Sequence, residues 1–256
     1  MKTEWLYGPH AVGEALAAGR RRVHELLLED RSGALRRLAA LAAAAAQRGV
    51  PVRRVSAAEL AAVAGGGRHQ GTAARVDAYP CAGLEEIPAA AAAAAEGPLL
   101  ALDGIVDPHN FGAIVRSALC AGTTAVVVPR DRSAPPTPAV SRASAGALEH
   151  VRLVRVTNLG RALDELKHRG YWVAGLDRAA PQSLFAAELP QPLVLVVGGE
   201  GGGMRRGILQ RCDLLLGIPQ AGPLDSLNVS VAAAVALFEI RRRRLAGAPG
   251  SAEGKR

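Results

Sequence analysis

Six short apolar runs, each four or five residues long, recur between residues 99 and 218 and limit the fold more than any other feature. They are Leu99–Leu102, Thr124–Val128, Val151–Val154, Trp172–Leu176, Leu193–Val197 and Leu214–Ile218. Runs of this length without polar alternation indicate strands that are buried on both faces. Helical patterns lie between several of them, at 111–120, 159–169 and 205–212, and a last amphipathic stretch covers about 227–244. This alternation predicts a mostly parallel α/β sheet with helices on both faces.

The first 80 residues predict a separate, smaller α/β unit. Helical patterns are expected at 10–18, from an N-cap at Ser32 to Arg48, and at 57–63. Strands are expected at 22–28, 52–55 and 72–76. We therefore predict an N-terminal domain over residues 1–79.

A change of composition separates this unit from the parallel sheet. Tyr79–Gly83 interrupts the pattern, and a run of alanines lies between Pro88 and Pro98. Low complexity bracketed by prolines is typical of a connection between domains. We predict a Pro/Ala-rich linker over 80–97, a second domain, which contains the parallel sheet, over 98–245, and a disordered tail over 246–256.

Several classes of protein are excluded on composition and spacing. The longest apolar stretches are well short of the roughly 18–20 residues that a membrane span needs, and residues 1–5 lack the apolar region of a secretory signal. Three cysteines lie far apart with no C-x-x-C, and His24-Glu25 lacks the second histidine of an H-E-x-x-H site. We expect no disulfide framework, no metal, no membrane partner and a reducing, cytoplasmic location.

The charge balance favours a polyanionic partner. The chain has 31 Lys+Arg against 23 Asp+Glu, a formal net charge of +8. A GC-rich coding bias would enrich arginine, but it does not require an excess of positive over negative charge. Contacts with the phosphates of a nucleic acid would account for that excess. The N-terminal candidates for RNA contacts are Arg20, Arg21, Arg22, Arg53, Arg54 and Arg68. Solvated surface charge is the alternative for each of them.

The loop at 102–112 is the first of three that would follow strand ends. Ligands of open parallel sheets bind beyond the carboxyl ends of the strands, so these loops are the places to look for a site. Asn110 could cap the following helix or hold a ligand. Arg116 lies in that helix among apolar residues, and a partly buried arginine needs an anionic partner or a functional role.

The second and third loops add one carboxylate and a polar helix start. Residues 197–204 read Val-Gly-Gly-Glu-Gly-Gly-Gly-Met, in which Met204 breaks the dinucleotide fingerprint and no Gly-Lys-Ser/Thr follows. A flexible connector does not account for a single carboxylate, Glu200, among five glycines. In residues 218–230, Asp225 or Ser226 is expected to cap the last helix, and Asn228 lies beside free backbone N–H groups.

In this order and spacing, the three loops resemble the motifs of the SpoU/TrmH family of RNA ribose 2′-O-methyltransferases. The resemblance spans 99–243 and rests on Asn110 with Arg116, Gly-Glu200-Gly and Ser226-Leu227-Asn228-Val229-Ser230. Ser144-Ala145-Gly146-Ala147 with Glu149-His150 belongs to it as well. Residues 7–12 and 69–76 resemble the ribosomal-protein-like substrate-binding domain of bacterial 23S rRNA guanosine methyltransferases. One departure is Gly202, where many members carry a second acidic residue.

The resemblance implies a fold, a cofactor and a reaction. The C-terminal domain would be a parallel α/β domain with a deep trefoil knot that binds S-adenosylmethionine, uses no metal and forms a homodimer. Positions matching the cofactor pocket are Gly198, Ile218 and Leu227. The reaction would be methylation of the ribose 2′-hydroxyl of one specific nucleotide, a guanosine, in 23S rRNA or a large-subunit assembly intermediate.

The same resemblance assigns catalytic roles to Arg116, Asn110, Glu200, Ser226 and Asn228. The family arginine is proposed to activate the hydroxyl, but its pKa above about 12 makes it a poor base. We favour Arg116 as a phosphate anchor and electrostatic stabiliser, while the other four position the ribose, the arginine and the loop. The group that removes the proton stays open.

Three other functions remain possible on the sequence. Two keep the chemistry: a tRNA ribose methyltransferase, or an rRNA adenosine methyltransferase that confers antibiotic resistance. The third is a non-catalytic RNA-binding protein that retains the fold.

Overall fold

The computed structural model describes residues 2–30, 36–90, 97–221 and 226–247. Ser32, part of the expected linker and most of the expected tail lie outside these residues. The chain divides into two compact units, and each is described by itself. The first unit contains residues 1–80, 111–116 and 134–151, and the second contains residues 81–110, 117–133 and 152–256.

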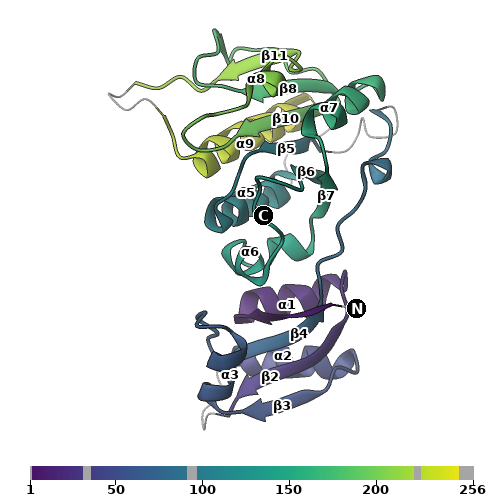
Figure 1. Ribbon diagram of the computed structural model, residues 1–256, viewed down its shortest axis with the longest axis vertical. Coiled ribbons are helices and arrows are strands. Elements are labelled where there is room, and N and C mark those ends of the chain that lie inside the picture. Colours follow the sequence, from purple (N-terminus) through teal and green to yellow (C-terminus); the bar gives the residue numbers. More distant parts are fainter. Residues whose placement is uncertain (1, 31–35, 91–96, 222–225, 248–256) are drawn as a thin grey trace. The chain divides into compact units, whose positions relative to one another are not determined.

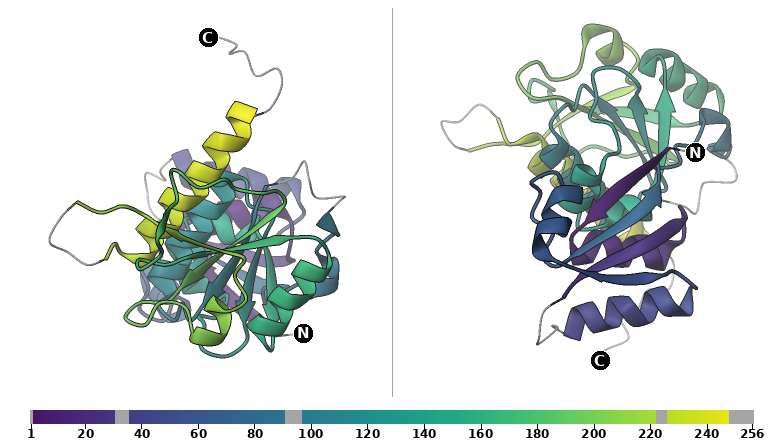
Figure 2. Two further views of the ribbon diagram at one scale, coloured as in Figure 1. Left: turned by 90° about the horizontal axis from the view of Figure 1, so that it is seen from above. Right: turned by 60° about the horizontal axis from the view of Figure 1, so that its bottom comes forward.

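The first unit is built on a four-stranded mixed sheet (Figure 2, right). Its strands are β1 (Thr3–Tyr7), β2 (Val23–Glu29), β3 (Val52–Val55) and β4 (Thr72–Asp77), in the order β1-β4-β2-β3. β4 pairs antiparallel with β1 and β2, whereas β2 and β3 are parallel. The three expected strands are confirmed, and β1 was not predicted because Thr3 and Glu4 obscure its short apolar pattern.

Helices cover both faces of this sheet. α1 (Pro9–Ala18) and α2 (Arg36–Gln47) share one apolar cluster with alternate strand residues, among them Leu6, Leu26 and Leu28. α3 (Ala57–Val63) packs on the opposite face, where Leu60 meets Leu27. The unit also contains α6 (Pro138–Ala143) and the 3-10 helix η2 (Ala147–Glu149), neither of which the sequence predicted.

The second unit is built on a seven-stranded parallel sheet (Figure 1). In chain order its strands are β5 (Leu99–Asp103), β6 (Ala125–Pro129), β7 (Arg152–Val156), β8 (Trp172–Leu176), β9 (Gln182–Ser183), β10 (Leu193–Gly198) and β11 (Leu214–Gly217). Their order across the sheet is β7-β6-β5-β10-β8-β11-β9, and every pairing is parallel. The six predicted strands are confirmed, and only the two-residue β9 was missed.

Both faces of the sheet are covered, as the apolar runs predicted. α7 (Leu159–His168) and α8 (Arg206–Leu209) share one core cluster with alternate residues of β5, β8 and β10. α9 (Val229–Gly247), yellow in Figures 1 and 2, packs against β10 through a stripe of buried residues. These are Val229, Ala233, Ala236, Leu237 and Ile240. No helix of the described residues is long and apolar enough to cross a membrane.

The segment expected to be a linker is partly folded onto the second unit. Ala82 forms a parallel bridge with Val154, and residues Leu84–Glu86 form the 3-10 helix η1. Ile87 and Ala90 are buried in the core cluster of this unit. The prediction of a linker over 80–97 is therefore wrong for residues 82–90, because Ile87 and Ala90 are buried in the core and Ala82 and Leu84 pack against it.

Candidate functional site

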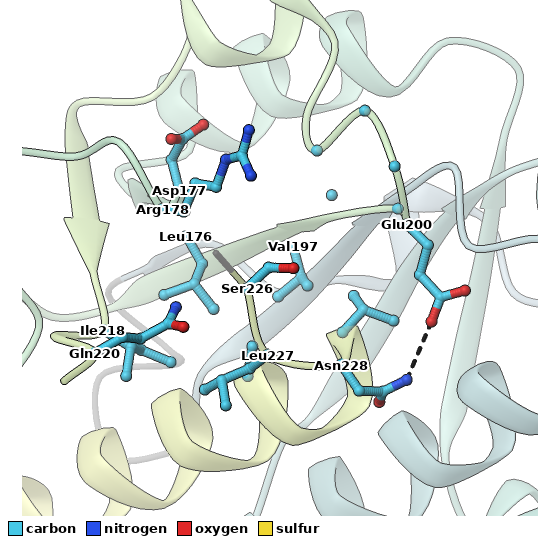
Figure 3. A pocket seen from close by; sticks show the side chains of 17 residues that line it. Leu176, Asp177, Arg178, Val197, Glu200, Ile218, Gln220, Ser226, Leu227 and Asn228 are labelled. Atoms are coloured by element: carbon cyan, nitrogen blue, oxygen red, sulfur yellow. Dashed lines mark hydrogen bonds between the residues drawn. The ribbon is translucent and has the colours of Figure 1, made fainter. Parts of the chain in front are cut away.

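A cavity of about 470 Å³ opens where β8, β10 and β11 end (Figure 3). This volume is typical of a site for a small molecule. The lining residues belong to the loops after these strands and to the first turn of α9. They are Leu176, Asp177, Arg178, Val197, Gly198, Gly199, Glu200, Gly201, Gly202, Gly203, Ile218, Gln220, Ser226, Leu227, Asn228, Val229 and Ala232.

All three residues predicted to hold a cofactor line this cavity. Gly198, Ile218 and Leu227 come from different loops, and Leu227 exposes 39% of its surface although it is apolar. Figure 3 shows Asp177 and Arg178 on one side of the cavity and Glu200 and Asn228 on the other. The cavity therefore combines an apolar wall with polar groups at its rim.

The loop after β8 contributes residues that the sequence analysis missed. Leu176, Asp177 and Arg178 line the cavity and belong to no motif identified in the sequence, whereas Gln220, which also lines it, belongs to the third loop. The strand expected at 172–176 ends at the same edge of the sheet as its parallel neighbours. That placement was the available signal for the first three.

The glycines of the loop after β10 are explained by the packing of the chain itself. A Cβ on Gly198 would lie 2.2 Å from the carbonyl carbon of Gly203, and one on Gly199 would lie 2.3 Å from the Gly104 oxygen. Gly201 and Gly203 have φ angles of +82° and +62°, a region that side chains disfavour. The loop can form only because these positions carry no side chain.

A buried carboxylate fixes the far end of this loop. Asp103, the last residue of β5, is 2% exposed. Its Oδ2 accepts a hydrogen bond from the Arg205 backbone N–H at 2.8 Å, and its Oδ1 accepts one from Arg205 Nε at 2.8 Å. The sequence analysis missed Asp103, although a carboxylate that ends an otherwise apolar strand was a usable signal.

Three of the predicted catalytic residues form one hydrogen-bonded cluster. Asn110 Nδ2 donates to Glu200 Oε1 at 2.6 Å, and Asn228 Nδ2 donates to the same oxygen at 3.1 Å. The Asn228 amide also lies 3.1 Å from Asn110 Oδ1. Both amides donate to Oε1, and Glu200 Oε2 has no donor among the described residues. The cluster presents a fixed carboxylate oxygen at the cavity rim.

The local structure of two helix starts holds the asparagines in place. Asp107 caps α5 (Pro108–Ala121), accepting from the N–H groups of His109 and Asn110. These hydrogen bonds lower the pKa of the Asp107 carboxyl. The interpretation of Asn110 as the cap is wrong, because it lies in the first turn and its amide reaches Glu200.

Asn228 caps α9, which was expected to begin at Asp225 or Ser226. The Asn228 Oδ1 accepts from the Ser230 N–H at 2.9 Å and from the Ser230 hydroxyl at 2.6 Å. Asp225 lies outside the described residues. Ser226 is exposed, lies before the helix and lines the cavity, so its predicted role as the cap is wrong.

Arg116 is exposed on α5 rather than partly buried. Ile114, Val115 and Ala118 take the fully buried positions of this helix. Position 116 lies two residues from 114 and from 118, so it points away from their face. Its guanidinium has no carboxylate partner among the described residues, which leaves it available to an anion.

The arginines predicted to bind RNA in the first unit fall into two groups. Arg20, Arg22, Arg53, Arg54 and Arg68 are exposed. Arg21 is only 5% exposed, and it pairs with Glu149 at 2.6 Å and with Glu4 at 2.5 Å. The prediction for Arg21 is therefore wrong, because two carboxylates already neutralise a side chain that solvent does not reach.

The cysteines and the metal-ligating side chains add no further site. Cys81, Cys120 and Cys212 are all free. Within the described ranges, no three His, Cys, Asp or Glu side chains gather where they could hold a metal ion.

The fold and the cavity are typical of α/β proteins that bind a small molecule at the carboxyl edge of a parallel sheet. Two family models match the chain. Residues 97–238 match the SpoU rRNA methylase family, and residues 5–81 match the RNA 2′-O ribose methyltransferase substrate-binding family. The chain belongs to the SpoU rRNA methylase family.

Curated relatives cover nearly the whole chain. A 23S rRNA (guanosine-2′-O-)-methyltransferase RlmB of Xanthomonas campestris is 43% identical over 245 residues, 95% of this chain and 98% of that one. The RlmB of Pseudomonas putida is 44% identical over 247 residues, 94% and 97% of the two chains. Among solved structures, the SpoU methyltransferase AviRb of Streptomyces viridochromogenes, in complex with AdoMet, is 26% identical. It has a TM-score of 0.78 and covers 95% of this chain and 91% of that one.

Proposed function

We propose that this protein transfers a methyl group from S-adenosylmethionine to the ribose 2′-hydroxyl of a guanosine in 23S rRNA. The observation that carries the proposal is the Asn110–Glu200–Asn228 cluster at the rim of the cavity. The relatives named for this activity match the chain over almost its full length. The match of residues 5–81 to a substrate-binding family supports an RNA substrate.

The cavity suits S-adenosylmethionine. Its volume of about 470 Å³ and its apolar wall fit an adenosyl group, and the exposed Leu227 would lose its contact with water there. Gly198 and Ile218 would offer backbone groups, and the AdoMet complex of AviRb supports this cofactor.

The residues of this chain have to align the ribose hydroxyl with the cofactor and to stabilise the negative charge that develops on the hydroxyl oxygen. The cofactor, when bound, supplies a methyl group that is attached to a sulfonium, and the thioether formed on transfer is a good leaving group. Asn110 and Asn228 hold Glu200 in one orientation, so that Oε2 can accept from a substrate hydroxyl or orient a donor. Arg116 would hold a substrate phosphate with its planar fork and stabilise negative charge near the hydroxyl. Ser226, on the cavity wall, would contact the ribose or the cofactor.

The remaining parts of the proposal concern topology, assembly and location. We infer a trefoil knot in the second unit, a homodimer formed through it and a cytoplasmic location, and membership of the SpoU family supports these three inferences. The exposed Arg20, Arg22, Arg53, Arg54 and Arg68 would contact rRNA or a large-subunit assembly intermediate.

Mapping of 2′-O-methyl groups in 23S rRNA tests the function. A strain lacking this gene should lose methylation at one guanosine, and the wild-type gene should restore it. A complete and unchanged set of 2′-O-methyl groups in the deletion strain would contradict the proposal.

Arg116→Ala should abolish restoration of that methyl group while the protein still folds and binds S-adenosylmethionine. Arg116→Lys should also lose at least about a hundredfold in rate, roughly 2.7 kcal/mol, because an ammonium cannot reproduce two aligned donors. The rates are measured with purified protein and radiolabelled cofactor. Near-normal turnover of Arg116→Lys would show that position 116 supplies only a positive charge.

A further inference from the structure

Three arginines lie at the carboxyl edge of the parallel sheet, on the side away from the cavity. Arg130 and Arg132 follow β6, and Arg155 is the penultimate residue of β7. We call these three residues the basic edge. They belong to the second unit, as do the cavity and the Asn110–Glu200–Asn228 cluster.

The strand order places the basic edge beside the cluster. The order is β7-β6-β5-β10-β8-β11. The loops that carry Asn110 and Glu200 follow β5 and β10, whereas the cavity lies over β10, β8 and β11. Since neighbouring strands are about 4.8 Å apart, β6 and β7 end roughly 5–10 Å beyond β5. The cluster thus lies between the cavity and the basic edge.

Backbone contacts hold the basic edge in place. The Arg130 backbone N–H donates to the Val156 carbonyl at 2.8 Å, and the Arg155 guanidinium donates through Nη2 to the Arg130 carbonyl at 2.8 Å. Arg132 has a φ of +56°, which is unusual for a residue with a side chain and occurs often at functional sites. The loop is therefore a defined structure that presents exposed side chains at 130 and 132.

The charge of the basic edge is not neutralised. Among the described residues, no carboxylate pairs with Arg130, Arg132 or Arg155, and the buried Nε of Arg155 has no acceptor. Arg205 and Arg211 of the same unit, in contrast, pair with Asp103 and Asp164.

Neighbouring groups leave the basic edge positive. The loop itself contains one acid, Asp131, against its two arginines. α7 begins directly after β7, with Arg161 in its first turn, and the N-terminus of a helix adds positive partial charge. The edge therefore favours an anion.

We propose that the basic edge binds the phosphates of the RNA strand next to the nucleotide that is methylated. The inference rests on the proposed function. A ribose that reacts at the cluster has the cofactor on one side, and the strand order places the ends of β6 and β7 on the other side, where the RNA strand would continue. The exposed guanidinium groups of Arg130 and Arg132 can each hold a phosphate with paired donors.

The double variant Arg130→Ser/Arg132→Ser, in the full chain, tests the basic edge. Binding to a 23S rRNA fragment is measured by fluorescence anisotropy over a series of salt concentrations. We expect Kd to rise at least about tenfold near 0.1 M salt. The slope of log K against log salt should fall by about 1.4, since each phosphate contact on a single strand contributes about 0.7. The affinity for S-adenosylmethionine should stay unchanged.

Two further variants control for folding and for general charge. Arg152→Ser removes one positive charge from the amino end of β7, about 10 Å along the strand from Arg155, and should keep the wild-type slope. Arg130→Lys/Arg132→Lys keeps the charge and should keep most of the slope. A wild-type Kd and slope in the double serine variant would overturn the proposal, as would an equal loss in Arg152→Ser.

The test is separate from that of the proposed function. If the wild-type protein transfers no methyl group to rRNA, the function is wrong. If it does and the double serine variant binds RNA normally, only the basic edge is wrong.

Discussion

The two sheets of this molecule use their charged residues in opposite ways. The first sheet carries charges on its face: Arg75 pairs with Glu25 at 2.7 Å and Arg53 pairs with Glu59 at 2.9 Å. In the parallel sheet, all residues of β5, β6 and β10 are buried. Polar groups of these three strands can act only at the strand ends, as Asp103 does.

This difference predicts where substitutions matter. Charged pairs on a half-exposed face are screened by water and contribute little. At the ends of buried strands, each loop is held by a few specific contacts, and these contacts set the geometry of the cavity. Substitutions at the ends of the buried strands should therefore cost much stability and cofactor affinity, whereas substitutions on the face of the first sheet should cost little.

The largest expected effect is that of Gly198→Ala. Its Cβ would lie 2.2 Å from the Gly203 carbonyl carbon, and a backbone group cannot give way cheaply. We expect a loss of about 3 kcal/mol or more of stability and no measurable cofactor binding. Thermal unfolding and calorimetry with S-adenosylmethionine measure the two effects.

Gly202→Ala is the matched control in the same loop. A Cβ at this position would meet nothing within 4 Å, so its stability and cofactor binding should stay close to the wild type. Equal losses in both variants would mean that the loop fails for a reason other than close packing at Gly198.

An intermediate effect is expected for Asp103→Asn. The amide would present an N–H group to Arg205, which already donates there, and would remove the charge from a buried pair. We expect a loss of about 2–4 kcal/mol. Glu25→Gln, on the face of the first sheet, should cost less than about 1 kcal/mol. Urea denaturation of both variants checks the comparison, and a larger loss in Glu25→Gln would reverse it.

The smallest expected effect is a difference between the alkylation rates of two cysteines. Burial raises the pKa of Cys212 to about 12, so its thiol stays protonated at pH 8 and should react slowly with iodoacetamide. Cys120 is exposed and should react first. Mass spectrometry of alkylated peptides over time measures the order, and faster labelling of Cys212 would mean that its loop opens in solution.

The strands of the parallel sheet could be predicted because burial on both faces leaves a continuous apolar run. The same logic failed for β1, where Thr3 and Glu4 precede only three large apolar residues. It also failed for residues 82–90, whose alanines and single proline resemble a linker although Ile87 and Ala90 are buried. Local composition does not reveal which surface a segment packs against.

The site could be predicted as a set of residues but not as a geometry. Asn110, Glu200 and Asn228 were identified from three loops, and the structure brings their side chains together. Asp103 and the lining of the β8 loop depend on strand order, which no single motif reports. Arg21 was misassigned because a run of three arginines does not show which side chain is buried.

Single-turnover methyl transfer by Glu200→Ala tests the central claim most directly. The full-length variant is incubated with radiolabelled S-adenosylmethionine and the 23S rRNA fragment that the wild type methylates, and cofactor affinity is measured in parallel. We predict a rate at least about a hundredfold lower, roughly 2.7 kcal/mol, with cofactor affinity within about twofold of the wild type. A variant that binds cofactor and methylates at the wild-type rate would show that the Asn110–Glu200–Asn228 cluster is not where the reaction takes place.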